Sequence, residues 1–182
     1  KNYGELITSK KRLLVIFRGI NTEYFDNSKI TSEKVKSFKS LINLNPEKFK
    51  ILLPGRLTRW KGQEMFIESL FILKTKYGKE NFQAIILGPD QGRKVYFKKL
   101  ISMIDKYNLK NNVFFLQHAK EMPVAYYISD VVVSASIEPE AFGRISVEAQ
   151  AMRRPILASN HGGSKETIIN GKSGFLFENN KP

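Results

Sequence analysis

Two basic residues stand on either side of the predicted start of a helix. Arg56 follows Gly55 at the end of an apolar run, and Lys61 comes five residues later, just before a helical pattern that includes Phe66. A helix N-terminus presents unpaired amide groups and a partial positive charge, so a guanidinium and an ammonium group beside it can bind a diphosphate. The spacing alone is also satisfied by two solvated cations on a basic surface.

Two glutamates frame a second stretch that could bind a ligand. Glu140 and Glu148 lie on either side of a predicted helix start at Gly143. In one continuous helix their Cα atoms would be about 12 Å apart, which is too far for the close carboxylate pair of a retaining glycosidase. Each could instead accept hydrogen bonds from a different hydroxyl group of one long ligand, such as a sugar and a ribose. The amides of Phe142, Gly143 and Arg144 would then face the anionic middle of that ligand.

Two further motifs indicate turns. The sequence at 161–163 favours a glycine loop that leads into a short helix from Ser164. The sequence at 171–173 looks like the end of a phosphate-binding P-loop, but Glu166 stands where that motif requires glycine, and the residues that follow are strand-like. We therefore expect no P-loop here.

The elements that must position these residues follow from the pattern of apolar residues. Apolar runs predict strands at 13–17, 50–53, 83–87, 113–116, 131–134 and 155–158, with a further strand at 174–177. Between them, apolar residues recur at helical spacing in 66–77, 97–104 and 145–152. This alternation predicts an α/β fold, a doubly wound, Rossmann-like parallel sheet of about six strands with right-handed crossovers. Sites in such folds lie in the loops after the carboxyl ends of the strands, where both candidate stretches are found.

Composition excludes several classes of protein. A chain of 182 residues with 42% apolar residues fits one domain, and the absence of cysteine excludes disulfide scaffolds and thiol chemistry. No apolar run is long enough for a membrane-spanning helix, and two histidines without cysteine lack metal-ligand spacing, so no metal or cofactor is expected. Because the chain begins at Lys1 without a signal-like stretch, we expect a piece of a longer protein, with 1–12 as an interdomain linker remnant and 13–182 as the domain.

The net charge of +13 is unevenly distributed. Residues 1–111 contain 23 Lys and Arg against 10 Asp and Glu, whereas residues 112–182 contain 7 of each kind. A one-sided positive field attracts phosphorylated ligands, anionic membrane surfaces or polyanions, although solvated lysines on helix exteriors give the same arithmetic. Charge alone does not choose among these partners.

Taken together, the motifs resemble, in collinear order, the C-terminal nucleotide-sugar-binding domain of retaining glycosyltransferases of family 4, which have the two-domain GT-B fold. The resemblance covers nearly the whole chain, through 17–25, 55–62, 86–88, 129–133, 140–148, 162–166 and 171–176. It implies one half of a GT-B fold and a hexosyltransferase that moves sugar from a UDP- or GDP-sugar to a cell-envelope or lipid-linked glycan. It further implies a cytoplasmic protein, peripheral on the inner face of the plasma membrane, with no metal and no nucleic-acid partner.

The resemblance also implies a role for each matching residue. Arg56 and Lys61, beside Gly55, would neutralise the donor diphosphate, and Glu140 would hold hydroxyls of the donor sugar. Glu148 would bind the ribose. The remaining implied donor contacts are the amides of Phe142, Gly143 and Arg144 and base contacts from Leu116, Gln117 and His118. In mechanism this would be electrostatic stabilisation of the departing phosphate, with the sugar held for front-side attack.

Two departures and one alternative accompany this interpretation. Ala141 and Arg144 replace a glycine and an aliphatic residue that are common in the family, so a positive side chain could enter the phosphate or acceptor region. The acceptor-binding N-terminal domain and the last helices have no counterpart in the sequence, so we expect this fragment alone to transfer no sugar. The alternative is a basic nucleic-acid-binding α/β module, motivated by the charge and by aromatic residues among lysines at 94–99.

Overall fold

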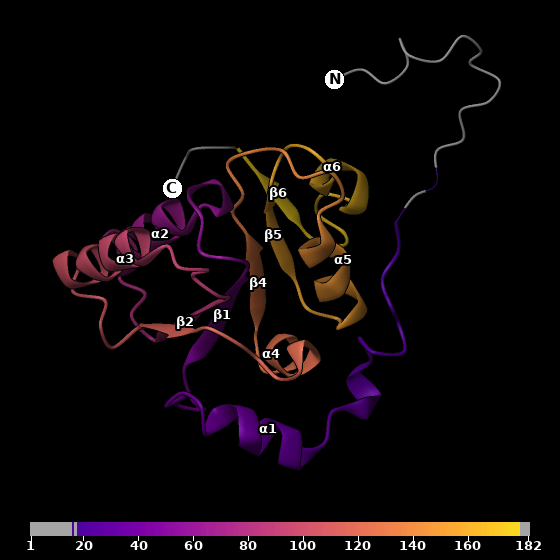
Figure 1. Ribbon diagram of the computed structural model, residues 1–182, viewed down its shortest axis with the longest axis horizontal. Helices are drawn as coiled ribbons and strands as arrows, with labels where there is room; N and C mark the ends of the chain where they lie inside the picture. The colour runs from indigo at the N-terminus through magenta and orange to yellow at the C-terminus, as the bar shows by residue number, and fades with distance from the viewer. Residues whose placement is uncertain (1–15, 17, 179–182) are drawn as a thin grey trace, which may run out of the picture.

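The structure of the chain is a computed structural model that describes residue 16 and residues 18–178. Its centre is a six-stranded, entirely parallel sheet with the strand order β3-β2-β1-β4-β5-β6 (Figure 1). The strands are β1 (Phe49–Pro54), β2 (Phe82–Leu87), β3 (Val113–Leu116), β4 (Val131–Ser134), β5 (Ile156–Ser159) and β6 (Phe175–Phe177). From β1 the chain winds outward to β3, and it then crosses back to begin the second half at β4.

Helices cover both faces of the sheet (Figure 1). The α-helices are α1 (Ser32–Lys39), α2 (Gln63–Thr75), α3 (Lys94–Lys106), α4 (Met122–Tyr127), α5 (Arg144–Ala151) and α6 (Ser164–Thr167), and the short 3-10 turns are η3 (Asn27–Lys29) and η4 (Arg59–Lys61). The pair α2 and α3 lies on one face, whereas α1, α4, α5 and α6 lie on the other. Within the described residues, no helix is long and apolar enough to cross a lipid bilayer.

The alternation of side chains along each strand divides the apolar residues between two cores. In β1, Ile51 and Leu53 pack with α2 and α3, whereas Leu52 packs with α4 and α5 on the opposite face. Strands covered on both faces become continuous apolar runs, and all six residues of β2 are buried. This explains why the strands could be found from the sequence as uninterrupted apolar stretches.

Most of the expected elements are confirmed. Five of the six apolar runs and the further run at 174–177 form the six strands, and the fold class is as expected. The expected strand at 13–17 and the linker at 1–12 fall outside the described residues, apart from Ile16, which lies in no helix or strand. The helical pattern at 66–77 extends too far, because α2 ends at Thr75 and Tyr77 is exposed.

A glycine allows the two halves of the sheet to meet closely. Gly62 caps α2 in a left-handed conformation with φ of +73°, and a Cβ atom there would lie 1.8 Å from the main-chain oxygen of Ala135, just after β4. The amide of Ile137 also donates to the carbonyl of Trp60 over 2.8 Å. The η4 turn after β1 is therefore packed directly against the segment after β4.

We predict that Gly62→Ala strongly destabilises the protein, because it adds both backbone strain and a main-chain clash. Gly78→Ala is the matched control, since Gly78 also has a positive φ, of +61°, but no atom within 4 Å of an added Cβ. The control should cost about 1–2 kcal/mol of unfolding free energy, and Gly62→Ala roughly 2 kcal/mol more. Urea unfolding measures both, and equal losses would contradict the close approach.

Candidate functional site

A cleft of about 790 Å³ opens where β1 and β4 end, and it contains most of the predicted site residues. It is lined by Gly55, Arg56 and Lys61 from the loop after β1 and by Glu140, Phe142, Gly143, Arg144 and Glu148 from the loop after β4 and the start of α5. Residues 18–21, 24 and 25, which precede the sheet, also line the cleft. The structure thus brings together two stretches that are about 80 residues apart in the chain.

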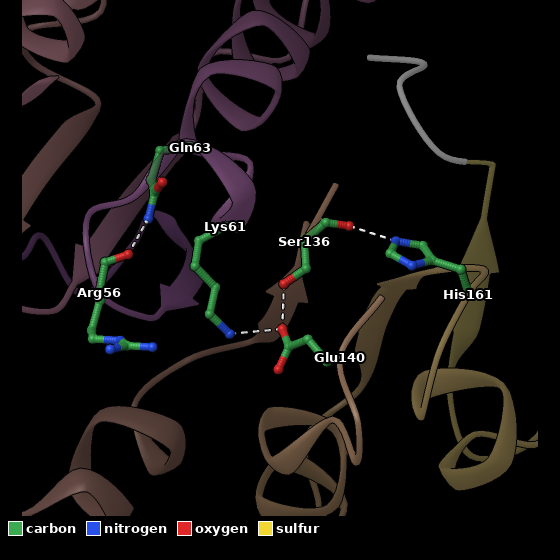
Figure 2. Close-up of polar contacts among 6 residues, drawn as sticks. All are labelled: Arg56, Lys61, Gln63, Ser136, Glu140 and His161. Carbon is green, nitrogen blue, oxygen red and sulfur yellow. Dashed lines mark hydrogen bonds and ion pairs between the residues drawn. The ribbon is translucent and has the colours of Figure 1, made fainter. Parts of the chain in front are cut away.

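An ion pair joins the two stretches at the floor of the cleft. The Nζ atom of Lys61 lies 2.7 Å from Oε1 of Glu140, and the two side chains are only 12% and 16% exposed (Figure 2). The hydroxyl of Ser136 donates to the same Glu140 oxygen. Lys61 is therefore not a solvated surface cation, because it is paired and largely buried. Its ammonium has three donors, so it can contact Glu140 and an anionic ligand together.

Arg56 is exposed above this pair and is placed through its backbone. The buried side chain of Gln63, the first residue of α2, donates from Nε2 to the carbonyl oxygen of Arg56 over 2.9 Å (Figure 2). Both cations also lie against the ring of Trp60, at 5.9 Å for Arg56 Cζ and 4.4 Å for Lys61 Nζ. One aromatic ring therefore holds the two positive charges next to each other.

Glu148 is the most deeply buried charged group of the cleft, with 5% of the residue exposed. Its Oε2 accepts a 2.7 Å hydrogen bond from the hydroxyl of Tyr126, and its Oε1 accepts hydrogen bonds from Arg144 at 2.9 and 3.2 Å. Burial, followed by the nearby Glu148 charge, raises the pKa of Tyr126 well above its ordinary value, so its phenol stays a donor. Oε1 thus accepts two hydrogen bonds from Arg144, whereas Oε2 accepts one and has a second lone pair that can accept a ligand hydroxyl.

The glycine loop at 161–163 packs against the main chain of residues 140–142. The amide of Gly163 donates to the carbonyl of Glu140 over 2.7 Å, and a Cβ atom on Gly163 would lie 2.4 Å from the carbonyl carbon of Phe142. His161 places Nε2 2.7 Å from the carbonyl oxygen of Ser136, so this nitrogen carries a proton (Figure 2). The motif that the sequence marked only as a turn therefore holds the backbone of the cleft in place.

The three residues expected to contact a base do not line this cleft. Leu116 ends β3 and packs against the apolar core, and Gln117 and His118 are exposed in the next loop. The structure therefore groups the cations, the two glutamates and the intervening loop, but it does not add 116–118 to them. The reason is the strand order, because β3 is at the far edge of the sheet from β4.

The profile of the family described as "Glycosyl transferases group 1" matches residues 35–182, which includes every residue that forms the ion pair and the glutamate network. The chain belongs to this family. The match favours the enzyme interpretation over a basic nucleic-acid-binding module. It also agrees with the sheet, which is the Rossmann-like layer found in one half of a GT-B fold.

Individual proteins that are similar to the chain also include glycosyltransferases. The chain is 32% identical over 146 residues to a D-inositol 3-phosphate glycosyltransferase of Paenarthrobacter aurescens. The matched region covers 79% of this chain and 35% of that protein. A glycosyltransferase structure from Rickettsia africae superposes with a TM-score of 0.89 at 34% identity, over 95% of this chain and 45% of that one. The Anabaena HepE structure in complex with UDP-glucose has a TM-score of 0.81 at 27% identity, and the match covers 92% of this chain and 44% of that one. The chain thus spans less than half the length of these relatives.

The structure adds residues to the site that sequence reasoning did not single out. Trp60, Ser136 and Tyr126 each contact one of the predicted charged groups, and Gln63 holds the backbone of Arg56. Trp60 could have been noticed, because it is the single tryptophan of the chain and stands next to Lys61. The other three gave no signal, since serine, tyrosine and glutamine occur in many surroundings. Their contacts depend on how the loops fold, even where the partner is only 4 residues away, as for Ser136 and Glu140.

We predict that Tyr126→Phe costs about 1.5–3 kcal/mol of unfolding free energy near pH 8, because it removes a donor from a buried carboxylate. The folded-state pKa of Tyr126 is raised, so its contribution is complete below the ordinary tyrosine pKa of about 10 and is lost as pH rises further. The stability gap between the wild type and the variant should therefore narrow between pH 8 and pH 11.

Tyr127→Phe is the control, because Tyr127 is partly exposed and its hydroxyl has no hydrogen-bond partner among the described residues. It should change stability by less than about 0.5 kcal/mol at both pH values. Urea unfolding at the two pH values measures all three proteins, and a gap that widens with pH would contradict the assignment.

Proposed function

We propose that the cleft binds a nucleoside-diphosphate sugar and that the chain is the C-terminal, donor-binding domain of a retaining, metal-independent hexosyltransferase. The observation that carries the proposal is the cleft itself, where two cations of the loop after β1 meet two hydrogen-bonding glutamates, one in the loop after β4 and one in α5. A nucleotide sugar has the matching sequence of groups, namely ribose hydroxyls, an anionic diphosphate and sugar hydroxyls. The UDP-glucose bound by the Anabaena neighbour supports a donor of the UDP-sugar type, and a GDP-sugar has the same groups at these positions.

In this proposal, Arg56 and Lys61 bind the diphosphate and stabilise the charge that develops on it as the sugar leaves. Charge-assisted contacts from a guanidinium and an ammonium group supply the neutralisation that a divalent cation provides in other transferases. The ring of Trp60 keeps the two cations together, which reduces the cost of bringing them to the same ligand. The start of α5, at Gly143 and Arg144, offers amides to the same phosphates.

The two glutamates then act on opposite ends of the donor. Glu140 has one oxygen engaged by Lys61 and Ser136, and its other oxygen has no partner among the described residues, so it can accept sugar hydroxyls. Glu148 is fixed by Tyr126 and Arg144 and can accept a ribose hydroxyl on the second lone pair of its Oε2 atom. Fixed acceptors at both ends would hold the sugar in one orientation for front-side attack.

The acceptor is assigned to the whole enzyme and not to this chain. The chain spans under half the length of its relatives, and the acceptor side of the cleft must come from the remainder. We propose a cell-envelope or lipid-linked glycan as the acceptor, bound at the cytoplasmic face of the plasma membrane.

We predict that Arg56→Ala raises the Kd of UDP roughly tenfold to a hundredfold, the expected loss of one charge-assisted contact. Lys61→Ala should weaken binding more, because it leaves the Glu140 carboxylate unpaired and facing the diphosphate. Lys39→Ala, on the exposed side of α1, is a control that should leave the Kd unchanged. Isothermal titration with UDP, GDP and ADP measures these values, and unchanged affinity in a folded double variant of Arg56 and Lys61 would disprove the assignment.

We predict that variants of the two glutamates change the affinity for a nucleotide and for a nucleotide sugar in different ways. Glu148→Gln is expected to weaken UDP and UDP-glucose equally, because both ligands contain the ribose. Glu140→Gln is expected to weaken UDP-glucose more than UDP, because only UDP-glucose carries the sugar. Titration of both variants with both ligands provides the four affinities, and equal losses for all four pairs would refute the division of roles.

A further inference from the structure

A second groove, of about 800 Å³, lies beside the donor cleft and shares Trp60 with it. It is formed by the η4 turn and the first turn of α3, and its walls include Trp60 and Tyr96. Tyr96 is tied down by a hydrogen bond from its hydroxyl to Oε1 of Gln63 at 3.1 Å. One of the two aromatic rings of the groove, that of Tyr96, is therefore anchored to the same glutamine whose side chain positions Arg56.

Cations surround these two rings. Arg59, Arg93, Lys94 and Lys99 line the groove with a single carboxylate, Glu64, which is already paired with Lys99 at 2.5 Å. The side chains of Arg59 and Lys94 have no hydrogen-bond or ion-pair partner among the described residues. Lys98, one turn after Lys94 on α3, adds another exposed cation that is likewise unpaired within the described part of the chain. The rim therefore has an excess of positive charge: Lys99 is paired and Arg93 donates to Gln91, whereas three cations are not neutralised within the described residues.

An apolar side chain projects from the middle of these charges. Val95 is 85% exposed. Other apolar residues of α3 pack into the protein: Leu100 and Ile104 are buried, and the ring of Phe97 packs edge-on against that of Phe115, with 5.0 Å between the ring centroids. Valine is a poor choice for an exposed helix position on propensity grounds, since it loses side-chain freedom there without gaining contacts. Its position is explained if a partner covers it.

We propose that this surface, which we call the η4–α3 surface (Arg59, Trp60, Arg93, Lys94, Val95 and Lys98), docks on an anionic lipid bilayer. An apolar side chain ringed by lysine and arginine is the pattern of interfacial membrane contacts, in which the apolar group enters the headgroup region and the cations bind lipid phosphates. A polyanion in solution would use the cations but would gain nothing from Val95. Because Trp60 lines both grooves, docking places the mouth of the donor cleft next to the lipid surface. The inference stands whatever donor the cleft binds.

The test uses the chain as it is, with vesicles of phosphatidylcholine containing phosphatidylglycerol and with vesicles of phosphatidylcholine alone. Trp60 is the only tryptophan, so its fluorescence reports on this surface directly, and co-sedimentation gives the bound fraction. Three variants are compared with the wild type: Lys94→Glu/Lys98→Glu, Val95→Ser, and the charge-matched control Lys36→Glu/Lys39→Glu on the exposed side of α1. UDP affinity is measured in each, so that a failure of the donor proposal is seen separately.

We expect the wild type to bind only the anionic vesicles, with a blue shift of Trp60 emission and with binding that weakens as ionic strength rises. The α3 double variant should lose binding by about tenfold or more, Val95→Ser should lose it severalfold, and the α1 control should keep most of it. Equal losses in the α1 and α3 double variants would overturn the localisation. Unchanged vesicle binding by Val95→Ser would show that the cations bind without an apolar contact and would overturn the proposed role of Val95. Absent binding by the wild type would overturn the membrane proposal as a whole.

Discussion

The position of β1 next to β4 is the constraint on which the site depends. The chain leaves β1 toward β2 on one side, and it leaves β4 toward β5 on the other. The loops that follow these two strands therefore separate as they leave the sheet, and a crevice opens between them at the carboxyl edge. Among the described strands, no other neighbouring pair has this property. From β1 to β3 each strand is added on one side of the sheet, and from β4 to β6 each is added on the other side. The cleft is in this sense a consequence of strand order.

Two glycines and one ion pair make this crevice into a defined site. Gly62 permits the turn after β1 to touch the main chain after β4, and Gly163 permits the loop after β5 to touch the main chain beside Glu140. The Lys61–Glu140 pair then links the two sides at the floor. Main-chain contacts at Gly62 and Gly163 hold the two sides as well, so the geometry of the site does not depend on the ion pair alone.

The structure also relates the donor cleft to the proposed membrane surface. Both grooves use the segment 58–61 after β1, and Trp60 lies in the wall between them. An enzyme that takes a water-soluble nucleotide and a lipid-linked acceptor needs an aqueous donor site close to a bilayer. In the functions proposed above, cations on both sides of one tryptophan would serve the two requirements, with one set binding the diphosphate and the other facing lipid phosphates.

The sequence by itself determined the six strands, four of the six α-helices, the parallel α/β class and most of the charged residues of the site, whereas α1 and α4 were not predicted. It could do so because fully buried strands and amphipathic helices leave periodic apolar patterns, and because glycine and charged residues mark the loops between them. The resemblance to glycosyltransferases rested on such local motifs, taken in order. Arg56, Lys61, Glu140 and Glu148 were all found in this way, and all four line the cleft.

The tertiary structure alone decided which of these residues meet and in what state. Lys61 and Glu140 are 79 positions apart, and no local pattern shows that they pair or that pairing leaves Lys61 buried. The support of Glu148 by Tyr126, the exclusion of 116–118 from the cleft and the sharing of Trp60 between two grooves likewise depend on strand order and register. A sequence pattern reports the surroundings of a residue over a few positions, whereas these contacts arise only when distant loops are brought to one edge of the sheet.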